Sequence, residues 1–234
     1  MENAGREDSI LLLTMGTSFY SQALIPVRAA VIMLGLCTLP TIAVRIMPFG
    51  DSITAGEDEY GAYRADLYAM LDSAGIVLDY VGSQNSGPSR LPDRDHEGHW
   101  SWRIGDLAGM AGEWVVRYRP DVVLLMAGTN DMFGPDSMDT IVARLDSLVG
   151  TIFELRPNAL VFLSSIPPIP YESVELRVEE FNDGIRELVR RRSKKRADIV
   201  FADNHAALTV DDLADGLHPS NEGYHKMAVV WYEA

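Results

Sequence analysis

The stretch Ile42-Ala-Val-Arg-Ile-Met-Pro-Phe-Gly-Asp-Ser-Ile-Thr54 joins an apolar run to a short turn that contains a serine. Residues 42–49 have the apolar and β-branched content of a buried strand, and Gly50 ends the run. The chain is then expected to stay in a loop until a helical pattern begins near Ala62. In an α/β sheet, a serine just past a strand lies at the edge where ligands bind. Gly-Asp-Ser is also common in purely structural turns, so a functional role for Ser52 depends on residues elsewhere in the chain.

Downstream of this stretch, strand patterns alternate with helix patterns. Strands are predicted at residues 76–81, 121–127, 160–164 and 199–202, and helices at about 62–75, 102–119, 137–155, 174–195 and from Ser220 onward. Residues 82–98 are rich in Gly, Pro, Ser and charge and are predicted to form a long irregular loop. The alternation predicts one α/β domain over residues 44–234, with a parallel sheet of about five strands covered by helices on both faces.

The charge balance is acidic, with 20 Lys and Arg against 34 Asp and Glu and a net charge of −14. This speaks against a nucleic-acid partner and against stable association with an anionic membrane, because both need a basic surface. The one basic cluster, residues 190–196, admits a nucleic-acid patch, but it closes a predicted helix, where cations complement the helix dipole. Cys37 is the only cysteine, so no intrachain disulfide can form.

Residues 1–43 differ from the rest of the chain and are treated as an N-terminal extension. Arg28 precedes an apolar segment, residues 29–43, that ends in small residues, and this pattern resembles a secretory signal. The segment is short for a membrane span. A secreted protein that starts near Val44 is therefore expected. An extra apolar element packed on the domain, and with it a cytoplasmic location, is the alternative.

Asp215-Gly-Leu-His218 brings a carboxylate and an imidazole together across a glycine turn. At this spacing the carboxylate can hydrogen-bond Nδ1 of the ring and leave Nε2 free, as a general base for a serine hydroxyl requires. Taken alone, the pattern also fits an Asx turn followed by a surface histidine. Combined with Ser52, it gives the chain order Ser…Asp…His.

Two further segments offer donors for an oxyanion. Asn130, in Gly128-Thr-Asn-Asp131, follows the most apolar predicted strand, and its side-chain amide can donate to a developing negative charge. The same four residues are also ordinary turn chemistry. Gly98, in His96-Glu-Gly-His99, can place a backbone N–H against the same oxygen.

Aromatic and histidine side chains near this segment have both functional and structural interpretations. Trp100 and Trp102 can stack on a sugar face, or they can be buried at the start of the next helix. A zinc site at His96 and His99 is weakly indicated, because the spacing is not His-Glu-x-x-His and a third ligand is not evident. His205 and His225 are interpreted as structural. Whether an ion binds near Asp93 and Asp95 is left open.

Four separated stretches, namely Gly50-Asp-Ser-Ile-Thr54, Gly98, Gly128-Thr-Asn-Asp131 and Asp215-Gly-Leu-His218, resemble the SGNH (GDSL-type) hydrolase superfamily. The resemblance runs from Val44 to the C-terminus. Val81-Gly-Ser-Gln-Asn-Ser-Gly87 and Asp95-His-Glu-Gly-His99 are similar to carbohydrate esterase family 3, the acetyl xylan esterases. The position after His99 usually carries small residues in that family, whereas this chain has Trp100-Ser101 there, which puts the shape of the acyl or sugar pocket in question.

The resemblance implies a flavodoxin-like three-layer fold and a serine esterase that removes acetyl groups from an acetylated polysaccharide or oligosaccharide such as xylan. It implies a triad of Ser52, His218 and Asp215, with an oxyanion hole formed by Ser52, Gly98 and Asn130. Substrate binding is assigned to Asp51, Trp100 and Trp102, and the chemistry needs no metal or organic cofactor. The oligomeric state is not indicated.

Three alternatives remain at this point. One is a broader SGNH esterase or lipase on short acyl esters, and another is a non-catalytic carbohydrate-binding domain on the same scaffold. A flavodoxin-like cofactor binder is the most remote of the three.

Overall fold

The computed structural model describes residues 43–56, 60–195 and 197–234. Its centre is a set of five parallel strands: β1 (Val44–Gly50), β2 (Leu78–Tyr80), β5 (Val122–Met126), β6 (Leu160–Ser164) and β7 (Ile199–Ala202). They run in the order β2-β1-β5-β6-β7, which is the flavodoxin-like order of a doubly wound sheet. The predicted five-stranded parallel core is therefore confirmed. From β1 the chain first adds β2 on one side of the sheet and then adds β5, β6 and β7 on the other side. Ligands bind at such a switch point, between β1 and β5, in folds of this class.

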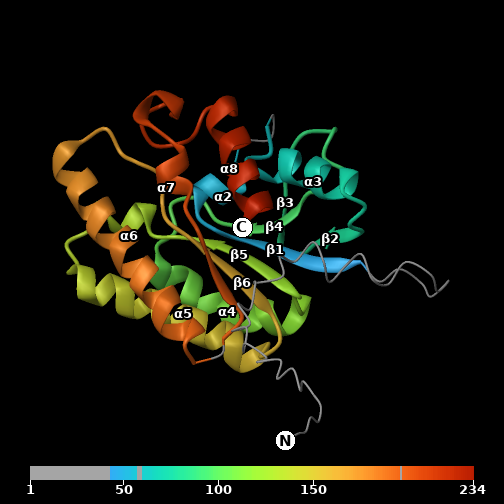
Figure 1. Cartoon of the computed structure of the whole chain (residues 1–234), viewed down its shortest axis with the longest axis horizontal. Coiled ribbons are helices and arrows are strands. Elements are labelled where there is room, and N and C mark those ends of the chain that lie inside the picture. Colours follow the sequence, from blue (N-terminus) through green and yellow to red (C-terminus); the bar gives the residue numbers. More distant parts are fainter. Residues whose placement is uncertain (1–42, 57–59, 196) are drawn as a thin grey trace, which may run out of the picture. The chain divides into compact units, whose positions relative to one another are not determined.

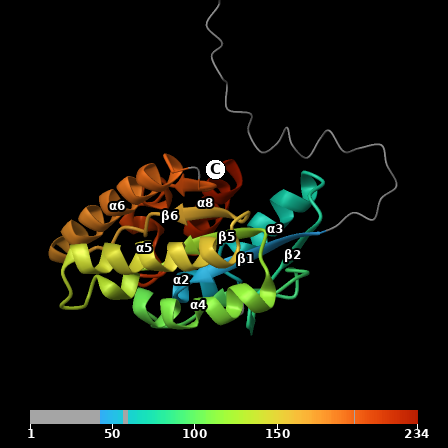
Figure 2. The ribbon, with the colours of Figure 1, turned by 90° about the horizontal axis from the view of Figure 1, so that it is seen from below.

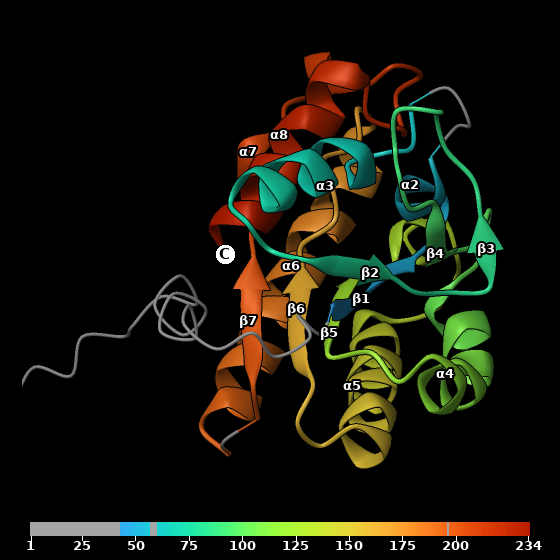
Figure 3. The same ribbon diagram turned by 90° about the vertical axis from the view of Figure 1, so that its right-hand side faces the viewer.

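Helices cover both faces of the sheet (Figures 1 and 3). On one face, α3 (Arg64–Ser73) packs against α8 (Asn221–Glu233). On the other, α5 (Met138–Leu155) packs between α4 (Ile104–Tyr118) and α6 (Glu172–Ser193), a layer that Figure 2 shows from below. Helices form here because each carries an apolar stripe, such as Ile141, Leu145, Leu148 and Ile152 of α5, all fully buried. The three-layer prediction is confirmed.

The predicted irregular loop at residues 82–98 contains two strands instead. β4 (Asp95–Gly98) runs parallel to the carboxyl end of β1, with Gly50 opposite Gly98, and β3 (Gln84–Asn85) pairs antiparallel with β4. Polar residues form a buried strand here because their groups are satisfied locally. Glu97 is fully buried and accepts hydrogen bonds from the N–H and hydroxyl of Ser83.

Four short helical segments complete the domain: α2 (Ser52–Ala55), η1 (Thr129–Asp131), α7 (Asn204–Ala207) and η2 (Val210–Asp212). The first of them replaces part of the loop expected after β1. At the end of α6, Arg191 and Arg192 both form ion pairs with Asp146, so the basic cluster is partly neutralised by the neighbouring helix.

The proposed secretory signal lies almost wholly outside the described residues. Among the residues that are described, no helix is both long and apolar enough to cross a membrane.

Candidate active site

Ser52 lies directly past the carboxyl end of β1, as the first residue of α2. Gly50 is required at the end of the strand, because a Cβ there would collide with the main-chain oxygen of Met126 on β5. Asp51 then caps α2, and its Oδ1 accepts a hydrogen bond from Ile53 N–H at 3.0 Å. The close strand contact and the cap together fix the position of the Ser52 hydroxyl.

Three residues from distant parts of the chain form one hydrogen-bonded line. The Ser52 hydroxyl lies 2.9 Å from His218 Nε2, and His218 Nδ1 lies 2.8 Å from Asp215 Oδ2. A neutral imidazole with its proton on Nδ1 satisfies both contacts, because it donates to Asp215 and accepts from Ser52. This is the arrangement that an activated serine nucleophile requires.

Asp215 is held in place by its own turn. Its Oδ1 accepts from the N–H groups of Leu217 and His218, at 2.9 and 2.7 Å. Partial burial acts to raise the pKa of Asp215, but hydrogen bonds from the His218 ring and from these two N–H groups outweigh it and lower the pKa to about 2. The carboxylate therefore stays ionised at neutral pH, and it keeps the Nδ1 proton of His218 in position.

Asn130 follows β5, the strand beside β1, so it lies at the same edge of the sheet as Ser52. Gly128 makes the turn possible: its φ is 124°, and a Cβ there would strike the Phe181 ring. The Asn130 Nδ2 donates one hydrogen bond to the Trp102 carbonyl, at 2.9 Å. An amide nitrogen has two protons, so this bond orients the side chain and leaves one donor for a ligand.

The position of Gly98 does not support the predicted oxyanion role. Its N–H donates to Nδ1 of His96 at 3.0 Å, and the residue lies inside β4 against the backbone of Ala55. An N–H that is committed to a buried imidazole is not free for a substrate oxygen. The sequence pattern could not show where this N–H points.

Asp51 is also placed differently from its predicted role in substrate binding. The side chain is fully buried, so no substrate reaches it. Burial raises the pKa of Asp51 to about 6, opposed by the Ile53 N–H and more weakly by Thr129 and His218. Oδ2 has no hydrogen-bond partner of good geometry within the described part of the chain. Asp51 is a positioning residue that caps the helix carrying Ser52.

The raised pKa of Asp51 predicts a pH-dependent term in stability. The native state holds the Asp51 proton more tightly than the unfolded chain, whose Asp pKa is 3.8. This stabilisation is therefore complete only well below pH 3.8, and it is lost as the pH rises through about 6. Its full size is about 3 kcal/mol. Asp51→Asn keeps an acceptor for the cap and removes the titration. Urea unfolding at pH 4 and pH 6.5 should show the variant gaining about 2 kcal/mol on the wild type between the two values, and an equal difference at both values would contradict it.

The two tryptophans predicted to bind substrate lie in different surroundings. Trp100 is 51% exposed, and its ring centroid is 5.4 Å from that of His218. Trp102 packs against the core, where it stacks on His99 at 4.4 Å, and Trp114 stacks on the same histidine at 4.7 Å. Trp100 therefore borders the site, whereas Trp102 mainly supports it. Ser101, between them, has a φ of 65°, a strained conformation for a residue with a side chain.

The histidines of this segment are held by protein groups. His96 Nε2 contacts the Ser86 hydroxyl at 2.7 Å while Nδ1 accepts from Gly98, so both ring nitrogens have protein partners. His99 Nε2 contacts Glu97 at 2.7 Å. Within the described residues, no group of three or more His, Cys, Asp or Glu side chains is arranged to hold a metal ion.

Arg64 is a residue of the site region that the sequence interpretation missed. It is completely buried and donates to four main-chain oxygens: those of Thr54, Ala55, Ser86 and Arg94. It thereby ties α2, which carries Ser52, to the chain around β3 and β4. The sequence did carry a signal for its burial. Arg64 lies three residues before Leu67 and seven before Leu71, so it falls on the apolar stripe of the predicted helix.

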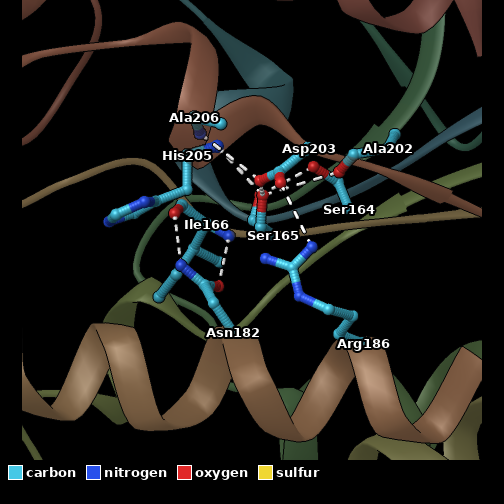
Figure 4. Close-up of polar contacts among 9 residues, drawn as sticks. All are labelled: Ser164, Ser165, Ile166, Asn182, Arg186, Ala202, Asp203, His205 and Ala206. Carbon is cyan, nitrogen blue, oxygen red and sulfur yellow. Dashed lines mark hydrogen bonds and ion pairs between the residues drawn. The ribbon is translucent and has the colours of Figure 1, made fainter.

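A second group of Ser, Asp and His residues lies at the ends of β6 and β7, and Figure 4 shows that it is not a triad. The Ser165 hydroxyl donates to Asp203 at 3.0 Å, but it accepts from the backbone N–H of His205, whose ring points away toward Glu175. The side chain of Asn182, on α6, accepts a hydrogen bond from the Ile166 N–H and donates one to the Ile166 carbonyl. The group fixes the ends of the two strands, in agreement with the structural interpretation of His205.

Comparisons with known proteins show the family of the chain. The model of the GDSL-like lipase/acylhydrolase family matches residues 49–226. The chain is 35% identical to a Clostridium thermocellum family 3 carbohydrate esterase, with a TM-score of 0.74 over 82% of this chain and 94% of that one. It is 31% identical to a family 3 carbohydrate esterase from Talaromyces cellulolyticus, with a TM-score of 0.73 over 81% and 94%.

A curated relative, a multidomain esterase from Ruminococcus flavefaciens, is 31% identical over 218 residues. The match covers 81% of this chain and 28% of that protein, so this chain spans about a quarter of the relative's length. Because the family model covers well over half of the sequence, the chain belongs to the GDSL-like lipase/acylhydrolase family of carboxylic ester hydrolases.

Proposed function

We propose that the protein is a serine esterase that removes acetyl groups from an acetylated carbohydrate. The observation that carries this proposal is the hydrogen-bonded line from Ser52 through His218 to Asp215. In the proposed reaction, the Ser52 hydroxyl attacks the acetyl carbonyl while His218 Nε2 takes its proton. The C–O bond to the sugar then breaks, and the sugar oxygen receives that proton from His218. Water hydrolyses the resulting acetyl-enzyme by the same route, with release of acetate.

The negative oxygen of each tetrahedral intermediate needs hydrogen-bond donors. We assign this role to the Ser52 N–H and to the second proton of Asn130 Nδ2, because both residues follow the carboxyl ends of the neighbouring strands β1 and β5. The bond from Asn130 to Trp102 supports the assignment, since it orients the amide before the substrate binds. Such preorganisation is what makes an oxyanion hole effective.

An acetylated carbohydrate, with acetyl xylan as the first candidate, fits the site better than a long-chain ester. Relatives over most of this chain are named as carbohydrate esterases, and Trp100 offers an exposed aromatic face beside His218. Aromatic faces of this kind stack on the apolar faces of sugar rings. The acidic charge of the chain is compatible with a neutral polysaccharide. The charged and apolar pattern of residues 28–43 supports secretion to such a substrate.

Acetate release from a panel of acetylated polysaccharides tests the proposal directly. We expect release from acetylated xylan or a related polymer, and faster hydrolysis of aryl acetates than of long-chain aryl esters. A strong preference for long acyl chains would instead indicate a lipase. No turnover of any ester by purified, folded protein would indicate a non-catalytic carbohydrate-binding domain.

A further inference from the structure

A pocket of about 330 Å³ is lined in part by Trp100, whose ring lies 5.4 Å from that of His218. Its lining also includes residues 84–86 and Ala55 and Gly56, at the end of the helix that carries Ser52. Another pocket, of about 460 Å³, is lined by residues of α4 and α5 and shares no residue with the first.

The position of the pocket relative to His218 indicates which part of the ester substrate it can bind. The departing alcohol of the ester must lie against His218 Nε2, because this nitrogen returns the proton to it. Trp100 flanks the His218 ring and also lines the pocket. A ligand that extends from the departing alcohol past Trp100 therefore enters the pocket. In a carbohydrate ester, the alcohol side is the sugar.

The lining offers uncharged hydrogen-bonding groups. His96 accepts the Gly98 N–H at Nδ1, so its own proton is on Nε2 and is donated to the Ser86 hydroxyl. Burial and the charge of Arg64 lower the pKa of His96 to about 2, which keeps this ring neutral. The Ser86 hydroxyl consequently keeps its own proton for a ligand. Gln84 donates to Ser83, and its amide oxygen is left as an acceptor.

The charges around the pocket do not favour an anionic sugar. No Lys or Arg is among its described lining residues. Arg64 contacts two of the lining residues, but it uses its N–H groups on main-chain oxygens, including those of Ala55 and Ser86. Asn85 also holds the Asp95 carboxylate at this rim, at 2.6 Å. Arg64 thus fixes the width of the pocket but does not offer it a positive charge.

We propose that this pocket is a subsite for an uncharged sugar unit adjacent to the acetylated one. Trp100 forms its aromatic side, and Gln84 and Ser86 provide its hydrogen bonds. The proposal rests on the proposed esterase function and adds to it a preference for acetylated oligosaccharides over acetylated single sugars, and for neutral chains over those with uronic acids.

The test compares kcat/KM for four substrates: 4-nitrophenyl acetate, an acetylated methyl pentoside, the acetylated neutral disaccharide, and the same disaccharide with a uronic acid in place of the second sugar. We expect the wild type to favour the neutral disaccharide over the single sugar by about tenfold, and over the uronate by a similar factor. Gln84→Ala, on an exposed two-residue strand, should reduce the first preference by about three- to tenfold, the typical effect of one lost hydrogen bond. Trp100→Ala should reduce it further.

Asn158→Ala is the matched control. This exposed amide lies just before the amino end of β6, whereas the active site lies at the carboxyl ends of the strands. It should leave the disaccharide preference unchanged. Equal kcat/KM for the single sugar and the disaccharide, or an unchanged preference in both pocket variants, would overturn the subsite while leaving the esterase intact. Preference for the uronate would overturn its neutral character. Failure of the wild type on all four substrates would instead reject the proposed function.

Discussion

Ser52→Ala is expected to lower kcat/KM for acetyl esters by on the order of 10⁴ to 10⁶, with little change in the free energy of unfolding. In the proposed reaction, the oxygen of this hydroxyl forms the bond to the acyl group, and alanine has no atom that can do so. Removing it deletes one oxygen from a helix that Asp51 still caps. A fluorophosphonate probe should label the wild type covalently and leave the variant unlabelled. Undiminished labelling of Ser52→Ala would place the nucleophile elsewhere.

The His218→Ala variant provides the second half of this test. Because Ser52 and His218 act as one unit at 2.9 Å, the double variant should be hardly slower than either single variant. Additive losses would mean that the two side chains contribute independently, and the proposed mechanism would then be wrong. His225→Ala is a suitable control, because the His225 ring contacts Asp66 and is not part of the hydrogen-bonded line from Ser52 to Asp215.

The sequence predicted the elements that follow simple periodic patterns. Strands β6 and β7 were predicted at their observed residues, and Ser220 caps α8 as expected. β6 is a mostly apolar run that is buried almost throughout, and α8 repeats buried residues at a helical period. The placement of Ser52, Asn130 and the Asp215–His218 turn at one edge also follows from the topology, because parallel strands end together.

What the sequence did not predict depends on contacts between distant polar groups. The sequence of β4 resembles a loop because Asp95, His96 and Glu97 are polar. Only the structure shows that these side chains pair with Asn85, Ser86 and Ser83, respectively. Asp51 and Ser52 are adjacent, yet one is fully buried and the other reaches His218. Gly98 has the right location for an oxyanion donor, but its N–H points to a ring two residues away. Directions of single bonds do not appear in residue patterns.

Asn130→Ala is expected to lower kcat by about 10²- to 10³-fold while KM changes much less, because the lost donor acts mainly on the charge that develops in the transition state. The substitution also removes the bond to the Trp102 carbonyl, which by itself costs about 1 kcal/mol of stability. A kinetic loss of this size therefore needs to be separated from loosening of the Trp102 segment.

Asn130→Asp makes that separation. Both variants lose the donor to Trp102, and the aspartate in addition places a carboxylate against that carbonyl. A purely supporting role for Asn130 therefore predicts that the loss of activity follows the loss of thermal stability in each variant. If Asn130 faces the oxyanion, the aspartate places a negative charge against a developing one, and kcat should fall well below that of Asn130→Ala. Lowering the pH should then recover activity in the aspartate variant as its carboxyl is protonated. Equal kcat in the two variants at every pH would exclude Asn130 from the oxyanion hole and leave it a support for Trp102.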